Sequence, residues 1–291
     1  MRQVKQIYGA RPTHWVGDGF LVQPLFSHGD GRIDTDPFLM LDYAAPKEFK
    51  PNTAHPRGVG QHPHKGFETV TIACQGEVAH RDSSGGGGII REGDVQWMTA
   101  GNGIIHEEFH SPEFSERGGV FEMVQLWVNL PAIHKTAPAG YQHLANADIP
   151  VIDLPDQAGT VRLIAGEFNG ATGAAKTFSP INVWEVELHA DAETSLSVPE
   201  NHNLLMVVLR GEVRFNHHQD AKEGNLVTFE NGSGSVALEA THGKAAKLLL
   251  LSGVPIREPI AAYGPFVMNT DGEIRQAIHD FNAGKFGVIG G

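Results

Sequence analysis

Short apolar segments separated by glycine and proline turns run along most of the chain. Residues 67–73 are rich in β-branched side chains, and four consecutive glycines at residues 85–88 precede an Ile-Ile pair. Runs of this kind bounded by glycine are typical of antiparallel strands joined by tight turns. A second block of the same kind begins near Val183 and includes the apolar residues 204–209. The pattern therefore predicts an all-β protein.

The two strand-rich blocks resemble one another. In residues 71–78 and in residues 207–213 an apolar strand runs into Gly-Glu-Val, and a Gly-Asp or Gly-Asn turn follows at Gly93 or Gly224. An internal repeat of this kind indicates two similar β-domains.

The repeat and the distribution of proline suggest where the chain divides. Residues 131–160 contain four prolines and connect the two blocks. We therefore expect an N-terminal domain over residues 1–132, a linker region over residues 133–175 and a C-terminal domain over residues 176–291.

One amphipathic helix is predicted close to the C-terminal end of the sequence. Asp271 is the expected N-cap and Gly284 the expected residue after the C-cap. The apolar residues recur at the spacing i, i+3, i+4 and i+7 that places them on one helical face: Ile274, Ala277, Ile278 and Phe281. We expect this face to pack on a domain surface.

Charge and cysteine content argue against several classes of protein. The 22 basic and 34 acidic residues give a net charge of −12, which disfavours direct nucleic-acid binding. Cys74 is the single cysteine, so an intrachain disulfide is excluded. The strongly apolar run at residues 248–251 is far shorter than the ~20 residues of a membrane span. Because no apolar segment follows the basic residues 1–5, we expect no secretory signal and a soluble, cytoplasmic protein.

The chain has 16 histidines, and three of them belong to two pairs of side chains that stand out. His62 and His64 are two residues apart, and so are His106 and Glu108. On an extended strand, residues i and i+2 point to the same face, ~7 Å apart. Two such strands, side by side or facing across a barrel, would aim three imidazoles and one carboxylate at one point. That donor set suits a divalent first-row metal with positions left open for water or substrate.

Two long motifs surround these pairs. Residues 62–71 read His-Pro-His-Lys-Gly-Phe-Glu-Thr-Val-Thr, and residues 93–108 read Gly-Asp-Val-Gln-Trp-Met-Thr-Ala-Gly-Asn-Gly-Ile-Ile-His-Glu-Glu. These motifs closely resemble the pirin family of the cupin superfamily. Further matches at residues 36–42, 125–131 and 263–270 extend the resemblance through nearly the whole chain.

The resemblance implies two antiparallel β-barrel domains of the jelly-roll (cupin) type, with a metal only in the N-terminal one. The family's metal ligands carry over to His62, His64, His106 and Glu108. The general cupin pattern instead uses a carboxylate four residues after the second histidine, which here is Glu68. Strand parity does not decide which carboxylate is the fourth ligand, because Glu68 shares a strand face with His64 and Glu108 shares one with His106. The closer family favours Glu108, with Glu68 as a neighbour of the ligands.

The C-terminal copy of the repeat is expected to bind no metal. Aligning the two copies on their glycine turns places Ser197 and Pro199 opposite the first histidine pair, and Ala237 opposite His106. Since neither proline nor alanine has a donor side chain, we expect this domain to support and cover the first.

The resemblance also implies an activity. It points to a non-haem metal-dependent dioxygenase, a quercetin 2,3-dioxygenase, which uses O₂ to open the ring of flavonols with release of carbon monoxide. Fe(II) is the metal implied first, and Zn, Ni, Co, Cu and Mn suit the same donors. We expect Glu108 to ligate the metal and to accept the proton of the flavonol 3-hydroxyl, because an enolate is easier to oxidise than a phenol.

A second interpretation is a metal-dependent, redox-sensing regulatory protein that binds transcription factors or metabolic enzymes. The sequence contains no charge run or low-complexity tail that identifies a protein partner. Open coordination positions favour catalysis over a structural site, so a flavonol-like aromatic molecule and O₂ are the expected partners.

Overall fold

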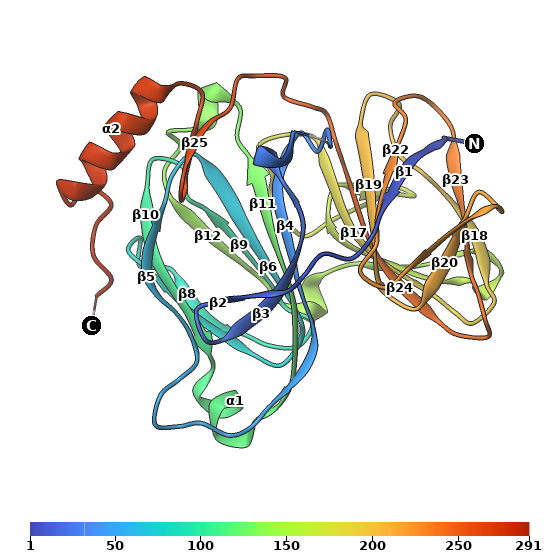
Figure 1. The fold of residues 1–291 in the computed structure, drawn as a ribbon, viewed down its shortest axis with the longest axis horizontal. Coiled ribbons are helices and arrows are strands. Elements are labelled where there is room, and N and C mark those ends of the chain that lie inside the picture. The colour runs from blue at the N-terminus through green and yellow to red at the C-terminus, as the bar shows by residue number, and fades with distance from the viewer. Residues whose placement is uncertain (32, 291) are drawn as a thin grey trace. The chain divides into compact units, whose positions relative to one another are not determined.

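The computed structural model describes residues 1–31 and 33–290 and consists mainly of antiparallel strands (Figure 1). The chain forms two compact units. The first unit contains residues Thr13–Pro24 and Phe38–Asn146, together with the segment that begins at Ile256. The second unit contains residues Met1–Pro12, Leu25–Pro37 and Ala147–Pro255. None of the helices in the described part of the chain is both long enough and apolar enough to cross a membrane.

Two antiparallel sheets form most of the first unit. The seven strands of the larger sheet are β2 His14–Val16, β3 Phe20–Ser27, β4 Phe38–Phe49, β6 Phe67–Gln75, β9 Val95–Thr99, β11 Gly119–Asn129 and β12 Gly140–Leu144. The four strands of the smaller sheet are β5 Gly58–His64, β7 Val78–Asp82, β8 Gly87–Ile90 and β10 Ile104–His110. The unit is completed by β25 Ala261–Tyr263, β26 Phe266–Met268, α1 Pro112–Arg117 and α2 Asp271–Asn282.

The second unit has sheets of the same two sizes. The larger sheet contains β1 Val4–Tyr8, β13 Val151–Asp153, β14 Gly159–Ala165, β17 Ile181–Leu188, β19 Asn203–Arg210, β22 Leu226–Phe229 and β24 Ala246–Gly253. The smaller sheet contains β18 Glu193–Ser197, β20 Glu212–Phe215, β21 Gln219–Lys222 and β23 Ser235–Ala240. A short hairpin consists of β15 Glu167–Phe168 and β16 Ala171–Thr172. Among the described residues, four single-turn 3₁₀ helices lie in loops, at His28–Asp30, Ala132–His134, Asn146–Asp148 and Pro155–Gln157.

The strand orders of the two units match. The larger sheets run β12-β9-β6-β11-β4-β3-β2 and β1-β22-β19-β24-β17-β14-β13, and the smaller ones run β5-β10-β7-β8 and β18-β23-β20-β21. The Gly-Glu-Val turns occupy equivalent places, with Gly76 at φ 83° and Gly211 at φ 77°. Both turns need glycine because such φ angles strain any side chain. The predicted all-β fold with two similar domains is confirmed.

The domain boundaries predicted at residues 132 and 175 stay a prediction. The two compact units are built from interleaved segments of the chain. β1 pairs with β22, with Tyr8 opposite Leu226, so the N-terminal strand belongs to the second unit. In Figure 1 this blue strand lies among the orange strands. Within the predicted linker, β12 joins the first unit and β13 and β14 join the second. The terminal helix, predicted with the C-terminal domain, packs in the first unit.

The predicted C-terminal helix is confirmed as α2. Its N-cap is Thr270, one residue before the predicted Asp271, because Thr270 and Glu273 form a reciprocal capping box. Gly284 follows the C-cap with φ 73°, as expected for a left-handed C′ residue. Ile274 and Ala277 are buried in a cluster with residues of β26, so the apolar face packs within the first unit.

Candidate metal centre

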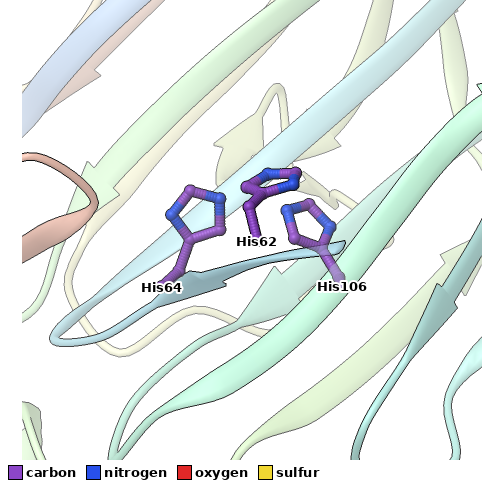
Figure 2. A group of neighbouring side chains, drawn as sticks. All are labelled: His62, His64 and His106. Atoms are coloured by element: carbon purple, nitrogen blue, oxygen red, sulfur yellow. The ribbon is translucent and has the colours of Figure 1, made fainter. Parts of the chain in front are cut away.

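Two neighbouring strands of the first unit carry the predicted histidine ligands. β5 and β10 are antiparallel, with His62 opposite His106 and His64 opposite Ile104. Figure 2 shows the three rings grouped on one side of these strands, and their centroids lie 4.2 to 4.9 Å apart. One nitrogen from each ring lies within 4.8 Å of the other two. The three imidazoles can therefore bind a single ion.

The spacing of β5 and β10 depends on one glycine and one irregularity. A Cβ atom on Gly58 would lie 2.2 Å from the Glu108 carbonyl oxygen, so only glycine allows this close approach. The register also shifts between His106 and Glu108, where Val59 rather than Gly60 pairs with Glu108. A bulge of this kind re-aims side chains beside functional sites.

Each of the three rings leaves one nitrogen for a ligand. His62 Nδ1 lies 2.8 Å from the Gly60 carbonyl oxygen, which can only accept a hydrogen bond from the ring. The Pro265 carbonyl accepts a hydrogen bond from the His64 ring. His64 Nδ1 and His106 Nε2 are buried without a hydrogen-bond partner. Because an unsatisfied buried polar atom costs free energy, a metal ion bound by these nitrogens fits the site.

Burial keeps two of the rings neutral. Desolvation, followed by repulsion from His62, lowers the pKa of His64 to about 3. Desolvation, followed by repulsion from the neighbouring histidines, lowers the pKa of His106 well below 6.5. Neutral imidazole is the form that ligates a metal. These two rings are therefore ready to accept a cation at neutral pH without releasing protons.

Glu108 lies beside the three-histidine group but is not a member of it. Its Oε1 accepts hydrogen bonds from Thr71 Oγ1 at 3.2 Å and from Gln96 Nε2 at 3.4 Å. Its carboxylate forms a second, overlapping group of metal-ligating side chains with His80 and His106. The structure thus brings three of the four predicted ligands together and holds the fourth next to them.

Glu68 belongs to neither of the two groups found among the described residues. It lies on β6 in the larger sheet, where Thr99 Oγ1 donates to its Oε1 at 2.7 Å. Burial, opposed by hydrogen bonds from Thr99 and Trp97, raises the pKa of Glu68 to about 7. Strand parity would place Glu68 on the same face as His64 only if one strand carried both residues. Gly66, at φ 88°, instead turns the chain between two strands of different sheets.

The turn after His64 is held by the segment that begins at Ile256. Val267 N donates to the Lys65 carbonyl at 3.0 Å. The buried ammonium of Lys135 donates to the carbonyl oxygens of Gly66 and Val267 and to Asn129 Oδ1, at 2.7 to 3.0 Å. Desolvation lowers the pKa of Lys135 to about 8. These contacts fix the end of the strand that carries His64.

Sequence reasoning missed two buried residues that adjoin the site. His80 and Asp82 lie on β7, directly opposite Glu108 and His106 on β10. His80 Nε2 lies 3.0 Å from Asp82 Oδ2, and His80 Nδ1 lies 3.4 Å from His106 Nδ1. The signal is present in the sequence, because His80 and Asp82 are a histidine and a carboxylate at the same two-residue spacing as His106 and Glu108.

A cavity of about 200 Å³ opens in front of the histidines. Its polar lining consists of the three histidines, Glu108, Asp42 and Gln125. Its apolar lining consists of Val16, Phe20, Val22, Met40, Val59, Met123 and Trp127. Trp97 and Phe67, which are aromatic residues within the two motifs, are fully buried in the core. A cavity that combines a few polar groups with a largely apolar lining suits a small, mostly apolar ligand.

The second unit holds apolar side chains at the equivalent positions. Val78 pairs with His110 in the first unit, and Val213 pairs with Ala240 in the second. By this register Val236 is equivalent to His106, one residue from the predicted Ala237. Its strand partner Leu196 is equivalent to His62. By the same register Leu238 is equivalent to Glu108, and Phe215 to His80. All four side chains are buried in one hydrophobic cluster that fills the second unit: Leu196, Phe215, Val236 and Leu238.

Comparison with known proteins places the chain in a family. Residues 20–128 match the model of the Pirin family, and residues 183–287 match the Pirin C-terminal cupin domain. A Pseudomonas aeruginosa protein named "putative quercetin 2,3-dioxygenase" is 50% identical over 286 residues, which are 98% of this chain and 99% of that protein. The chain belongs to the pirin family.

Solved structures agree with this assignment. A crystal structure of quercetin 2,3-dioxygenase from Acinetobacter baumannii is 53% identical, with a TM-score of 0.95 and full coverage of both chains. A bacterial pirin from Escherichia coli, solved in complex with nickel(II), shares the fold at 19% identity, with a TM-score of 0.61 over 86% of this chain and all of that one. The predicted two-domain cupin fold of this pirin is therefore confirmed.

Proposed function

We propose that this pirin is a non-haem, metal-dependent dioxygenase that acts on flavonols such as quercetin. The observation that supports the proposal most directly is the convergence of three imidazoles at one wall of a largely apolar cavity. The names of the Pseudomonas and Acinetobacter relatives, which match along their whole length, support the same reaction class.

We assign His62, His64 and His106 as metal ligands and Glu108 as the fourth. Glu108 lines the same cavity, and Thr71 and Gln96 both donate to its Oε1. Three histidines and one carboxylate leave up to two positions open on a six-coordinate ion.

Fe(II) is the metal we expect first. Ni(II) is the next candidate, because a bacterial pirin of the same fold is described as a nickel(II) complex, and Zn, Co, Cu and Mn accept the same donors. When bound, the metal would supply the Lewis-acidic, redox-active centre at which a flavonol and O₂ react.

The protein side chains have separate tasks in this proposal. Glu108 accepts the proton of the flavonol 3-hydroxyl, and Thr71 and Gln96 hold its carboxylate in place by hydrogen bonds. The apolar walls, which include Phe20 and Trp127, contact the flat rings and exclude water.

The experiment is anaerobic reconstitution of metal-stripped protein with Fe(II), followed by oxygen uptake with quercetin. His106→Ala is the test variant, and His279→Ala, which changes a largely exposed histidine on α2, is the matched control. Oxygen uptake that matches flavonol loss in the wild type and in His279→Ala, and is absent in His106→Ala, supports the proposal. Metal-loaded wild-type protein that consumes no oxygen with quercetin refutes it.

A second candidate, a metal-dependent redox-sensing regulator, is favoured by the size of the cavity. Its volume of about 200 Å³ is below the ~300 Å³ at which small-molecule pockets usually begin. A regulator needs a metal that changes oxidation state but no room for a substrate. Quercetin that fails to perturb the absorption spectrum of the Fe(II) protein would support this function over catalysis.

A further inference from the structure

Behind the three imidazoles lies a second layer of buried polar side chains that the proposed reaction does not use. His80 and Asp82 lie on β7, which pairs with β10. Their exposed fractions are 1% and 3%. A buried histidine and a buried carboxylate next to a metal ligand need a physical explanation.

The two residues form a chain of contacts that ends at His106. Asp82 Oδ2 lies 3.0 Å from His80 Nε2, and His80 Nδ1 lies 3.4 Å from His106 Nδ1. Gln96 Nε2 lies 3.2 Å from the same His80 nitrogen and 3.4 Å from Glu108 Oε1. His80 therefore contacts His106 directly and Glu108 through Gln96. These are the two residues of β10 that were predicted to bind the metal.

These contacts determine which nitrogens carry protons. A carboxylate only accepts hydrogen bonds, so His80 carries its proton on Nε2, toward Asp82. The Gln96 amide must turn its NH₂ group to the Glu108 carboxylate, and the same nitrogen donates to His80 Nδ1. Because both constraints leave His80 Nδ1 as an acceptor, the proton of His106 lies on Nδ1. The lone pair of His106 is then on Nε2, the buried nitrogen without a partner.

We propose that Asp82 and His80 are positioning residues, which hold His106 in the tautomer and ring orientation that direct Nε2 to the metal. The inference rests on the proposed metal centre. Partners that orient a ligating histidine in this way are worth about 10- to 100-fold in metal affinity. Here the carboxylate acts through a second histidine, and the equivalent of His80 in the second unit is the apolar Phe215.

The chain offers variants that isolate the hydrogen bonds. Asp82→Asn keeps Oδ1, which accepts from the backbone nitrogens of Ser84 and Gly86, and replaces the oxygen that accepts from His80. His80→Phe keeps a flat ring stacked on Tyr141 but removes the contacts with Asp82, Gln96 and His106. His80→Gln restores one donor and one acceptor. Tyr141→Phe is the matched control, because it preserves the stacking and lies outside the chain of contacts.

The test is Ni(II) affinity by competition with a chelator, together with the absorption spectrum of the Co(II) protein. We expect Asp82→Asn and His80→Phe to bind Ni(II) about 10- to 100-fold more weakly and to alter the Co(II) spectrum. His80→Gln and Tyr141→Phe should stay within a few-fold of the wild type. Circular dichroism checks that each variant folds, and Asp82→Asn carries the test if His80→Phe does not.

The outcomes separate this inference from the proposed metal centre. If His62→Ala abolishes Ni(II) binding while folded Asp82→Asn binds with wild-type affinity and spectrum, the centre stands and the positioning role is wrong. If the wild type itself binds neither Ni(II) nor Co(II), both are wrong. Loss of affinity in Asp82→Asn with recovery in His80→Gln supports the positioning role.

Discussion

Replacing Glu68 by glutamine should remove a pH dependence from the stability of the metal-free protein. Glu68 is fully buried, and its pKa in the folded protein is about 7 against an ordinary value of 4.5. Between these values the folded state retains a proton that the unfolded state has released. The free energy of unfolding therefore falls as the pH rises from 4.5 to 7, and this contribution is constant above 7.

The size of the effect follows from the shift. A difference of 7 − 4.5 = 2.5 pKa units at 1.36 kcal/mol per unit gives about 3 kcal/mol. Glutamine cannot ionise, so Glu68→Gln should lack this contribution. Since a constant packing difference between the two proteins cancels, the quantity to compare is the change in unfolding free energy between pH 5 and pH 8.

Urea unfolding at a series of pH values, followed by tryptophan fluorescence with a chelator present, measures this change. Because part of the contribution is already lost at pH 5, the wild type should lose about 2.5 kcal/mol more than Glu68→Gln over the interval. Thr99→Val removes a hydrogen bond that lowers the pKa of Glu68, so its loss should be larger than that of the wild type. Equal pH profiles for the wild type and Glu68→Gln would show that Glu68 does not retain its proton in the folded protein.

Three further predictions concern the site and its support. Glu108→Gln should retain part of the metal affinity but slow oxygen uptake with quercetin, because an amide is a poorer ligand and no base; unchanged turnover would exclude Glu108 as the proton acceptor. Lys135→Met leaves three buried oxygen acceptors without their donor, so urea unfolding should show a loss of about 2 kcal/mol or more, and an unchanged midpoint would contradict this. His64 and His106 have lowered pKa values, so both rings stay neutral between pH 7 and pH 5. Protonation of these two rings should therefore weaken Ni(II) binding little over this interval. Two rings of pKa 6.5 would together weaken Ni(II) binding about 600-fold over this interval, and a fall of that size in a chelator competition would contradict the lowered pKa values.

Local patterns predicted the elements and the histidine cluster correctly. The spacing of His62 and His64 needs only strand periodicity to place both rings on one face, and the structure places both there. The helical face of α2 depends in the same way on spacing within twelve residues. Features specified by neighbouring residues are accessible from one sequence.

Features that depend on pairing between distant strands were not accessible. The repeat alignment on turns missed the register by one residue at Val236, because loop lengths between the turns and the strands differ in the two units. Strand parity failed for Glu68 because Gly66 ends one strand and begins another sheet. The membership of α2 in the first unit depends on packing across more than a hundred residues.

The interleaved units impose an order on biosynthesis. The ribosome makes residue 146 of the first unit 110 residues before Ile256, which begins the segment that completes it. At about 5 to 20 residues per second the delay is roughly 5 to 20 s. During that time Lys135 lacks the Val267 carbonyl, and the turn after His64 lacks its clamp. We therefore expect nascent chains to acquire their metal late, after most of the second unit has been translated.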